Sequence, residues 1–179
     1  IGKSESPTLL SVNDGEVEFL DEQTMRVKNG DARVQKKKGF ESRFHIYNES
    51  EANLLGVVFT EPGIMTAAPY EVLDADHWIF AGTEVKTGDT FGAASLHERI
   101  PGGASGHETD KTSPASPAHI EIVARGLNPD RGGAEIIHYQ TSSGGAVFSV
   151  GSITYPASIL VDGIVSQITA NVIKRFATV

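Results

Sequence analysis

The sequence contains no cysteine among its 179 residues, which excludes disulfides, thiolate nucleophiles and metal sites held by cysteine. It also lacks any apolar run that approaches the roughly 20 residues of a membrane-spanning helix. Basic residues are few, because 15 Lys and Arg stand against 23 Asp and Glu, and the formal net charge of -8 repels a phosphate backbone. We therefore expect no nucleic-acid or membrane partner, and a cytoplasmic location with the periplasm as the alternative.

The first residues, IGKSESPTLL, lack an initiator Met, a charged segment and an apolar signal segment. They predict an internal start, so that the chain is one piece of a longer polypeptide. The 39% hydrophobic content is enough for one compact core in a chain of this length.

Residues 1–50 predict a β-rich lead of hairpins, because β-branched residues alternate with polar ones between turn dipeptides. Asn29-Gly30 lies between two such runs and predicts a two-residue hairpin turn, since both residues tolerate a positive φ. A looser turn is expected at Asp14-Gly15.

Residues 51–179 form the second region. Its first apolar run, ANLLGVVFTEPG, is typical of a strand covered on both faces.

The end of the chain predicts strands followed by one helix. AHIEIVARG, AEIIHYQ and AVFSVGSI read as strands, and the last two flank a Gly-containing turn and should pair as a hairpin. From Asp162 the period changes to three and four residues, which predicts an amphipathic helix with Asp162 as its N-cap. The expected apolar stripe contains Ile164, Val165, Ile168, Val172, Ile173 and Phe176. The fold class is therefore strand-rich mixed α/β.

Residues 82–117 predict a long loop, and a loop of this length in a compact domain is usually functional or disordered. It contains two His-Glu pairs, His97-Glu98 and His107-Glu108, on either side of a run of glycines. A hydrolytic metal site needs about three such ligands and an open position for water, but the spacing matches no zinc signature. Metal ligation and a substrate-side or interface loop both stay open. If the loop acts in catalysis, His107 and Glu108 are the expected pair, with the carboxylate orienting the imidazole.

Two serines follow the strand VFSV. Ser149 is predicted to be a strand residue, because Val147 replaces the first glycine of a nucleophile elbow. Ser152 follows Gly151 at the end of that strand, where α/β sheets place ligand crevices, so Ser152 and Tyr155 are candidate substrate-binding residues, together with His97 of the loop. The remaining histidines lie in or beside strand-like runs and are expected to be satisfied by local hydrogen bonds: His45, His77, His119 and His138.

The order of several motifs resembles the C-terminal region of the N,N-dimethylformamidase large (beta) subunit family. These motifs are HWIFAGT, TGDTFG, GASGHETDK, GGAVFSVGSITYPASIL and VSQITANVIKRF. The resemblance covers roughly residues 53–177, and its most specific part is the final forty residues. It leaves residues 1–50 outside.

The resemblance implies a chain whose lectin-like region is followed by a flavodoxin-like, class I glutamine-amidotransferase-like layer, which this segment closes. The implied activity is hydrolysis of a small N-substituted amide by water activated on a mononuclear non-haem iron. In the family, tyrosine phenolates and a carboxylate hold the iron. The tyrosines here, Tyr47, Tyr70, Tyr139 and Tyr155, match no ligand motif, so the resemblance places the ligands outside this chain.

The implied partners are the remainder of a longer polypeptide or another subunit, in an oligomer. Two other classes of function stay open: a ligand-binding domain that kept the scaffold without the chemistry, and a structural segment at a subunit interface.

Overall fold

The computed structural model describes residues 9–12, 15–19, 25–27, 50–60 and 62–178. Residue contacts divide the chain into two units, Ile1–Ser50 and Glu51–Val179. Within the described ranges, no helix combines the length and the apolar character needed to cross a bilayer.

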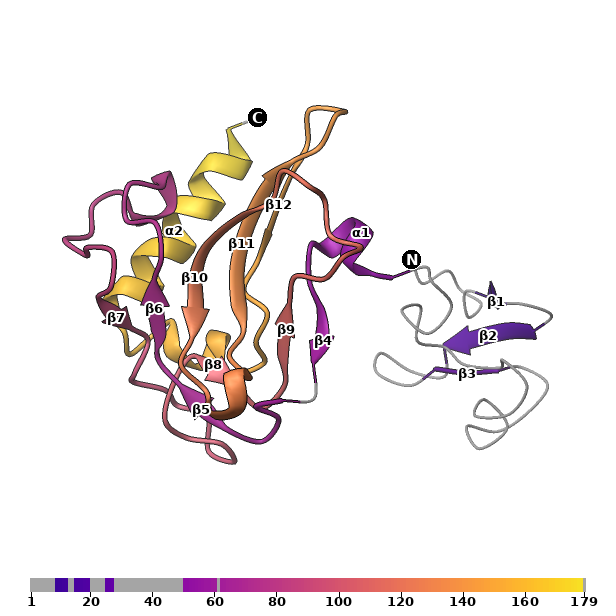
Figure 1. Ribbon diagram of the computed structural model, residues 1–179, viewed down its shortest axis with the longest axis horizontal. Helices are drawn as coiled ribbons and strands as arrows, with labels where there is room; N and C mark the ends of the chain where they lie inside the picture. Colours follow the sequence, from indigo (N-terminus) through magenta and orange to yellow (C-terminus); the bar gives the residue numbers. More distant parts are fainter. Residues whose placement is uncertain (1–8, 13–14, 20–24, 28–49, 61, 179) are drawn as a thin grey trace. The chain divides into compact units, whose positions relative to one another are not determined.

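The first unit contains a three-stranded antiparallel sheet (Figure 1). Its strands, in spatial order, are β1 (Leu9–Val12), β2 (Gly15–Phe19) and β3 (Met25–Val27). Val12 pairs with Gly15, so β1 and β2 are antiparallel neighbours joined where a turn was expected. Gly15 of the predicted Asp14-Gly15 turn belongs to β2, and Asp14 lies outside the described residues. The predicted Asn29-Gly30 turn lies outside the described residues.

A five-stranded antiparallel sheet forms the centre of the second unit, in the order β12-β11-β10-β6-β7. Its strands are β6 (Tyr70–Val72), β7 (Thr90–Phe91), β10 (Glu121–Gly126), β11 (Glu135–Gln140) and β12 (Ala146–Ser149). The predicted hairpin of the last two strands is confirmed, and β10 lies beside it as expected. The predicted fold class, strand-rich mixed α/β, is consistent with this structure. The predicted flavodoxin-like layer is not confirmed, because that fold is built on parallel strands and these pairs are antiparallel.

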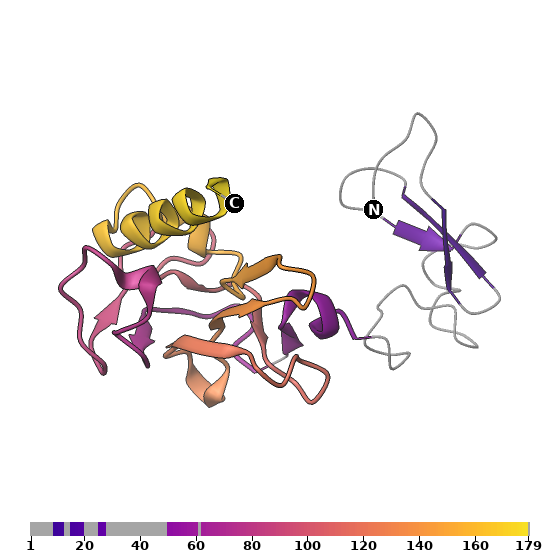
Figure 2. The ribbon, with the colours of Figure 1, turned by 90° about the horizontal axis from the view of Figure 1, so that it is seen from above.

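The helix α2 (Gly163–Ala177) lies across one face of this sheet (Figure 2). The Asp162 carboxylate accepts hydrogen bonds from the N–H groups of Ile164 and Val165 at 3.1 and 3.0 Å, which confirms the predicted N-cap. The helix buries three side chains against the sheet and its loops: Val165, Ile168 and Val172. The apolar stripe is narrower than predicted, because Ile173 is 63% exposed and Phe176 is 38% exposed.

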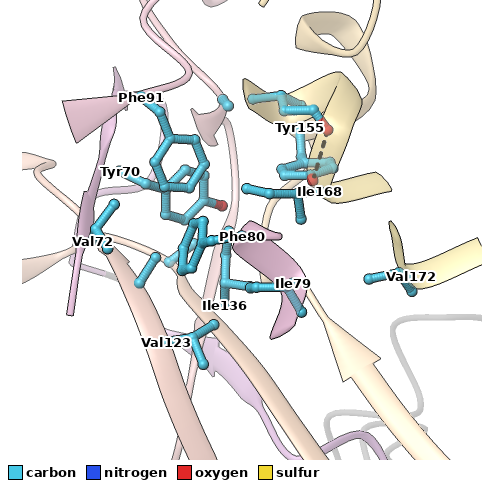
Figure 3. Packing of buried hydrophobic residues seen from close by; sticks show 14 residues of the cluster. Tyr70, Val72, Ile79, Phe80, Phe91, Val123, Ile136, Tyr155, Ile168 and Val172 are labelled. Atoms are coloured by element: carbon cyan, nitrogen blue, oxygen red, sulfur yellow. Dashed lines mark hydrogen bonds between the residues drawn. The ribbon is translucent and has the colours of Figure 1, made fainter. Parts of the chain in front are cut away.

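Aromatic and branched side chains fill the layer between α2 and the sheet (Figure 3). Tyr70 of β6 stacks on Phe91 of β7 with ring centroids 5.6 Å apart, and Ile136 of β11 is fully buried beside them. A smaller apolar cluster includes Ile137 and Tyr139. Since neighbouring strand residues point to opposite faces, β11 is covered on both sides.

The run ANLLGVVFTEPG does not form the predicted doubly covered strand. Ala52–Leu55 is one turn of α-helix, α1, and only Val58–Thr60 forms a strand, β4, of intermediate burial. Gly56 ends the helix in the left-handed conformation, with φ at 79°, and its N–H donates to Ala52 O. Alanine and leucine favour a helix as readily as burial favours a strand, so this apolar run alone does not decide between the two.

The segment predicted as a loop contains two short strands beyond β7. β8 (Ser105–Gly106) pairs with β5 (Ala67–Ala68), and β9 (Thr109–Lys111) pairs with β4. Three 3-10 turns complete the second unit: η2 (Trp78–Phe80), η3 (Pro129–Arg131) and η4 (Tyr155–Ser158).

Candidate functional site

Two carboxylates from β9 and the residue before it line a cavity of about 300 Å³. Thr109 is fully buried and donates to Gly132 O at 2.6 Å, so its neighbours Glu108 and Asp110 turn the other way, toward the cavity. The opposite wall is the segment that leaves β12, residues 149–153. An acidic pair therefore faces the end of a sheet strand.

The position of β9 is fixed from two sides. β4 pairs with it on one side, and a bridge between Thr109 and Ser152 holds it on the other. The N–H of Asp110 donates to Gly151 O at 2.8 Å. Gly151 has φ at 60°, and a Cβ at this position would lie 2.7 Å from Asp110 O, so only glycine allows this close approach.

One carboxyl of the pair has a raised pKa. Burial raises the pKa of Asp110, and the negative charges of Glu108 and Glu51 raise it further. Glu108 is more exposed than Asp110, and the two carboxyls share the cavity. Two carboxyls with unequal surroundings are the usual arrangement for a proton donor beside an ionised group.

The structure separates the expected pair His107 and Glu108. The His107 ring lies against His97, with ring centroids 5.2 Å apart, while Glu108 lies in the cavity. His107 has φ at 66°, which is unusual for a residue other than glycine. Its backbone is held in place by hydrogen bonds to Thr66 O and from the N–H of Met65. Among the described residues, the ligands expected on this loop do not gather into a metal-binding group.

The two substrate-binding candidates near β12 lie in different surroundings. The Ser152 hydroxyl accepts from the N–H of Gly106 and donates to Ala104 O, both at 2.8 Å, so it joins β8 to the end of β12 while its residue lines the cavity. Tyr155 is 4% exposed in the main core, and its hydroxyl lies 3.2 Å from Thr169 Oγ1. Ser149 belongs to β12, as predicted, and its hydroxyl donates to Leu55 O.

A family model described as N,N-dimethylformamidase beta subunit-like, C-terminal, matches residues 17–166. The chain belongs to this family. The match begins at residue 17, well before residue 53. Most of residues 1–50, which the resemblance left outside, therefore belong to the family region. It ends inside α2, before the final residues of the resemblance. No curated protein matches the chain.

The hydroxyls of the described tyrosines are engaged within the protein, which does not fit the iron ligation that the dimethylformamidase resemblance implies. The hydroxyl of Tyr155 lies 3.2 Å from Thr169 Oγ1. Burial raises the pKa of Tyr70 far above its usual range and that of Tyr155 to about 12. Burial also raises the pKa of Tyr139. The hydroxyls of Tyr70 and Tyr139 donate to backbone carbonyls, those of Val150 and Leu54.

Sequence reasoning counted Asp110 among the possible ligands of this loop but did not identify Asp110 and Glu108 as two carboxyls of one cavity. The available signal was their spacing of two residues, which places both side chains on one side of an extended segment. The spacing predicts a shared face only if residues 108–111 form an extended strand. The glycine-rich sequence around them predicted a loop instead. The pairing of β9 with β4 makes the segment extended.

Proposed function

We propose that the chain is a segment of an amidohydrolase subunit that hydrolyses the C–N bond of a small N-substituted amide with a metal-activated water. Membership of the dimethylformamidase beta subunit-like family supports the reaction class. We place the iron and its ligands in other parts of the subunit, because the hydroxyls of Tyr70 and Tyr139 donate to backbone carbonyls. The substrate and the reaction are taken from the family.

The acidic cavity supplies a chemical role for this segment. Amide hydrolysis adds water to the carbonyl carbon and releases an amine, whose nitrogen must gain a proton as the C–N bond breaks. Asp110 keeps its proton to a higher pH than an ordinary carboxyl, so it is suited to donate that proton. We assign Glu108 the role of its acid–base partner in the cavity. This pair, on the wall of one cavity, is the observation that carries the proposal.

The other predicted site residues have supporting positions. Ser152 holds the cavity wall together through its backbone hydrogen bonds. His97 and His107 lie on the loop that leads to Glu108, where they are candidates for contact with the substrate or a partner subunit. Tyr155 supports the packing of α2 from the core.

The test uses the intact enzyme and measures formate released from N,N-dimethylformamide. We expect Glu108→Gln to lower kcat by roughly 100-fold, the lower end of what a positioned acid–base group contributes. Glu84→Gln, the same change at an exposed side chain outside the cavity, serves as the control. Full activity in both variants would remove Glu108 from the mechanism, and an inactive intact enzyme would contradict the amidohydrolase proposal.

A second proposal, a subunit-interface or ligand-binding role without catalysis, is favoured by the apolar rim of the cavity. Leu54, Leu55 and Ile153 are 68%, 48% and 47% exposed, and the last two line the cavity. Such side chains are usually covered when a partner binds. The partner proposed is the remainder of the polypeptide or another subunit of an oligomer. Leu54→Ser with Ile153→Ser would then weaken assembly, measured by light scattering, without changing the fold.

The architecture of the whole subunit is a further proposal. We propose that β10–β12 and α2 close a flavodoxin-like or class I glutamine-amidotransferase-like layer in the full-length protein. Support comes from the helix that covers one sheet face and from membership of a family described as a C-terminal region. A structure of the intact subunit tests it, because a self-contained antiparallel sheet with no neighbouring strands would contradict it.

A further inference from the structure

Three potential metal ligands from separate parts of the chain meet at one point of the second unit. His77 precedes η2, Glu121 begins β10 and His138 lies in β11. One ligand atom from each lies within 4.8 Å of the other two. Glu121 Oε2 is 2.7 Å from His138 Nδ1 and 3.5 Å from His77 Nε2.

The antiparallel register of the sheet brings two of the three ligands together. Glu121 and His138 are direct cross-strand partners, so their side chains stand side by side on the same face. Alternation along β11 places His138 on the face of Ile136, which is the face that α2 covers. η2 packs against α2 and brings His77 to the same place.

The histidines are buried and incompletely satisfied. The side chains of His77 and His138 are 6% and 4% exposed, while that of Glu121 is 55% exposed. Among the described residues, His77 Nε2 and His138 Nε2 have no hydrogen-bond partner. The expected local hydrogen bond is present on Nδ1 of each ring, from the Ile79 N–H to His77 and between His138 and Glu121, but the two histidines are not lone residues. The expectation is confirmed for His119, whose Nε2 lies 2.8 Å from Gln140 O, and His45 lies outside the described residues.

We propose that His77, Glu121 and His138 form a binding site for a divalent transition-metal ion of the zinc class. Zinc bonds of about 2.0 to 2.2 Å in a tetrahedral arrangement place ligand atoms roughly 3.4 Å apart, close to the 3.5 Å between Glu121 Oε2 and His77 Nε2. Glu121 Oε2 and His138 Nδ1 lie closer, at 2.7 Å, and move apart when an ion replaces their hydrogen bond. Two imidazoles and one carboxylate are ligands that such ions accept. The exposed side of Glu121 leaves the fourth position to water. The site is distinct from the acidic cavity and does not depend on the amidohydrolase proposal.

The electrostatics of the cluster agree with its geometry. Burial lowers the pKa of His77. The hydrogen bond from His138 is the main cause of the lowered pKa of Glu121.

Metal binding makes a specific change at η2. In the metal-free chain, His77 Nδ1 accepts a hydrogen bond of 3.4 Å from the N–H of Ile79. A metal on Nε2 moves the ring proton to Nδ1, which can then no longer accept. The long Ile79 bond is lost at small cost. The amide signal of Ile79 is consequently a reporter that a merely structural histidine cluster would not move.

The test is titration of the untagged, metal-stripped chain with Zn²⁺ alone, followed by calorimetry and by amide NMR. We expect one zinc ion per chain and a shift of the Ile79 amide. His77→Asn removes the Nε2 ligand, while its side-chain oxygen can still cap η2. Glu121→Gln removes the charged ligand at an exposed position. Each variant should weaken zinc at least tenfold, because even loss of a group that only supports a metal ligand costs 10- to 100-fold.

Glu84→Gln is the matched control, since it removes one exposed negative charge without touching the cluster, and it should bind zinc as the parent chain does. Amide spectra of both variants establish that the fold is retained. Zinc binding that is absent, or that survives both His77→Asn and Glu121→Gln unchanged, overturns the proposal. A shifted Ile79 amide in the presence of Mg²⁺, which prefers oxygen ligands, would contradict the zinc-class assignment.

Discussion

Asp110 and Glu121 are carboxyl groups of one compact unit that have opposite electrostatic surroundings. Asp110 is partly buried among negative charges, and its pKa is raised. Glu121 stands beside two histidines, and its pKa is lowered. The difference shows that the surroundings decide whether the pKa of a carboxyl rises or falls: burial raises it at Asp110, and the hydrogen bond with His138 lowers it at Glu121. One suits proton donation, and the other suits ligation of a cation.

The largest effect is expected from removing the carboxyl of Asp110, whose pKa is raised. Asp110→Asn in the intact enzyme should lower kcat/KM for amide hydrolysis by about 100-fold or more, because the amide cannot donate a proton as the acid does. Asp130→Asn is the control, since Asp130 is exposed and asparagine tolerates its φ of 58°. Steady-state formate release measures both. Equal rates for the two variants would end the assignment of Asp110.

Gly151→Ala should disturb the acidic cavity and leave the histidine cluster intact. The new Cβ would lie 2.7 Å from Asp110 O and 3.0 Å from Glu135 O. We expect the free energy of unfolding to fall by more than about 1 kcal/mol in urea denaturation.

Gly88→Ala separates the two causes of the stability loss expected for Gly151→Ala, which are the positive φ and the close contact of the new Cβ. Gly88 also has a positive φ, at 92°, but a Cβ there meets nothing within 4 Å. This variant should lose only the conformational part, so a loss equal to that of Gly151→Ala would show that the close approach to Asp110 has no energetic weight.

Arg175→Gln tests the packing behind the histidine cluster. The guanidinium lies 4.7 Å from the centroid of the Trp78 ring, and this ring stands edge-on to His138 at 5.3 Å. Loss of the cation–π contact should cost about 0.5 to 1 kcal/mol of unfolding free energy. Fluorescence of Trp78, the single tryptophan, reports the same contact. An unchanged stability and an unchanged spectrum together would show that Arg175 does not hold Trp78.

The smallest effects are expected in the pH dependence of stability, where the two carboxyls should differ in sign. A raised pKa at Asp110 means that the folded chain binds the extra proton, so ionised Asp110 destabilises the fold above its folded pKa. This penalty disappears as the pH falls toward the usual value of 3.8. Asp110→Asn should therefore be more stable than the parent chain at pH 7, with a difference that shrinks toward pH 3.8.

Glu121 has the opposite linkage. Its lowered pKa contributes stability above the usual value of 4.5, and this contribution is lost as the pH falls through the folded pKa. Glu121→Gln should be slightly less stable at pH 7 and equal to the parent chain in acid. The effect is small because more than half of the side chain is exposed to water. Urea unfolding of both variants from about pH 3 to 7 measures the two curves, and slopes of the same sign would contradict the comparison.

Local signals made part of this structure predictable. The period of α2 and its cap at Asp162 depend on residues within a few positions of one another, and the Gly-containing turn before β12 fixes a hairpin in the same way. The helical turn at Ala52–Leu55 was missed because short apolar runs suit a helix or a strand until the tertiary contacts decide.

The sites were harder to predict, because they depend on contacts between distant segments. The prediction of Glu108 as a site residue stays a prediction, and its neighbour in the cavity, Asp110, follows from the pairing of β9 with β4. His77 meets His138 only through the packing of η2 and the register that sets Glu121 opposite His138. No spacing in the sequence encodes that register.

The most direct measurement is a carbon-detected NMR titration of the side-chain carboxyls of Asp110 and Glu121 in one sample. The account predicts that Asp110 titrates above 3.8 and Glu121 below 4.5. If Asp110 titrates at or below its usual value while Glu121 titrates at or above its own, the two surroundings are not opposite and the assigned roles of both carboxyls are wrong.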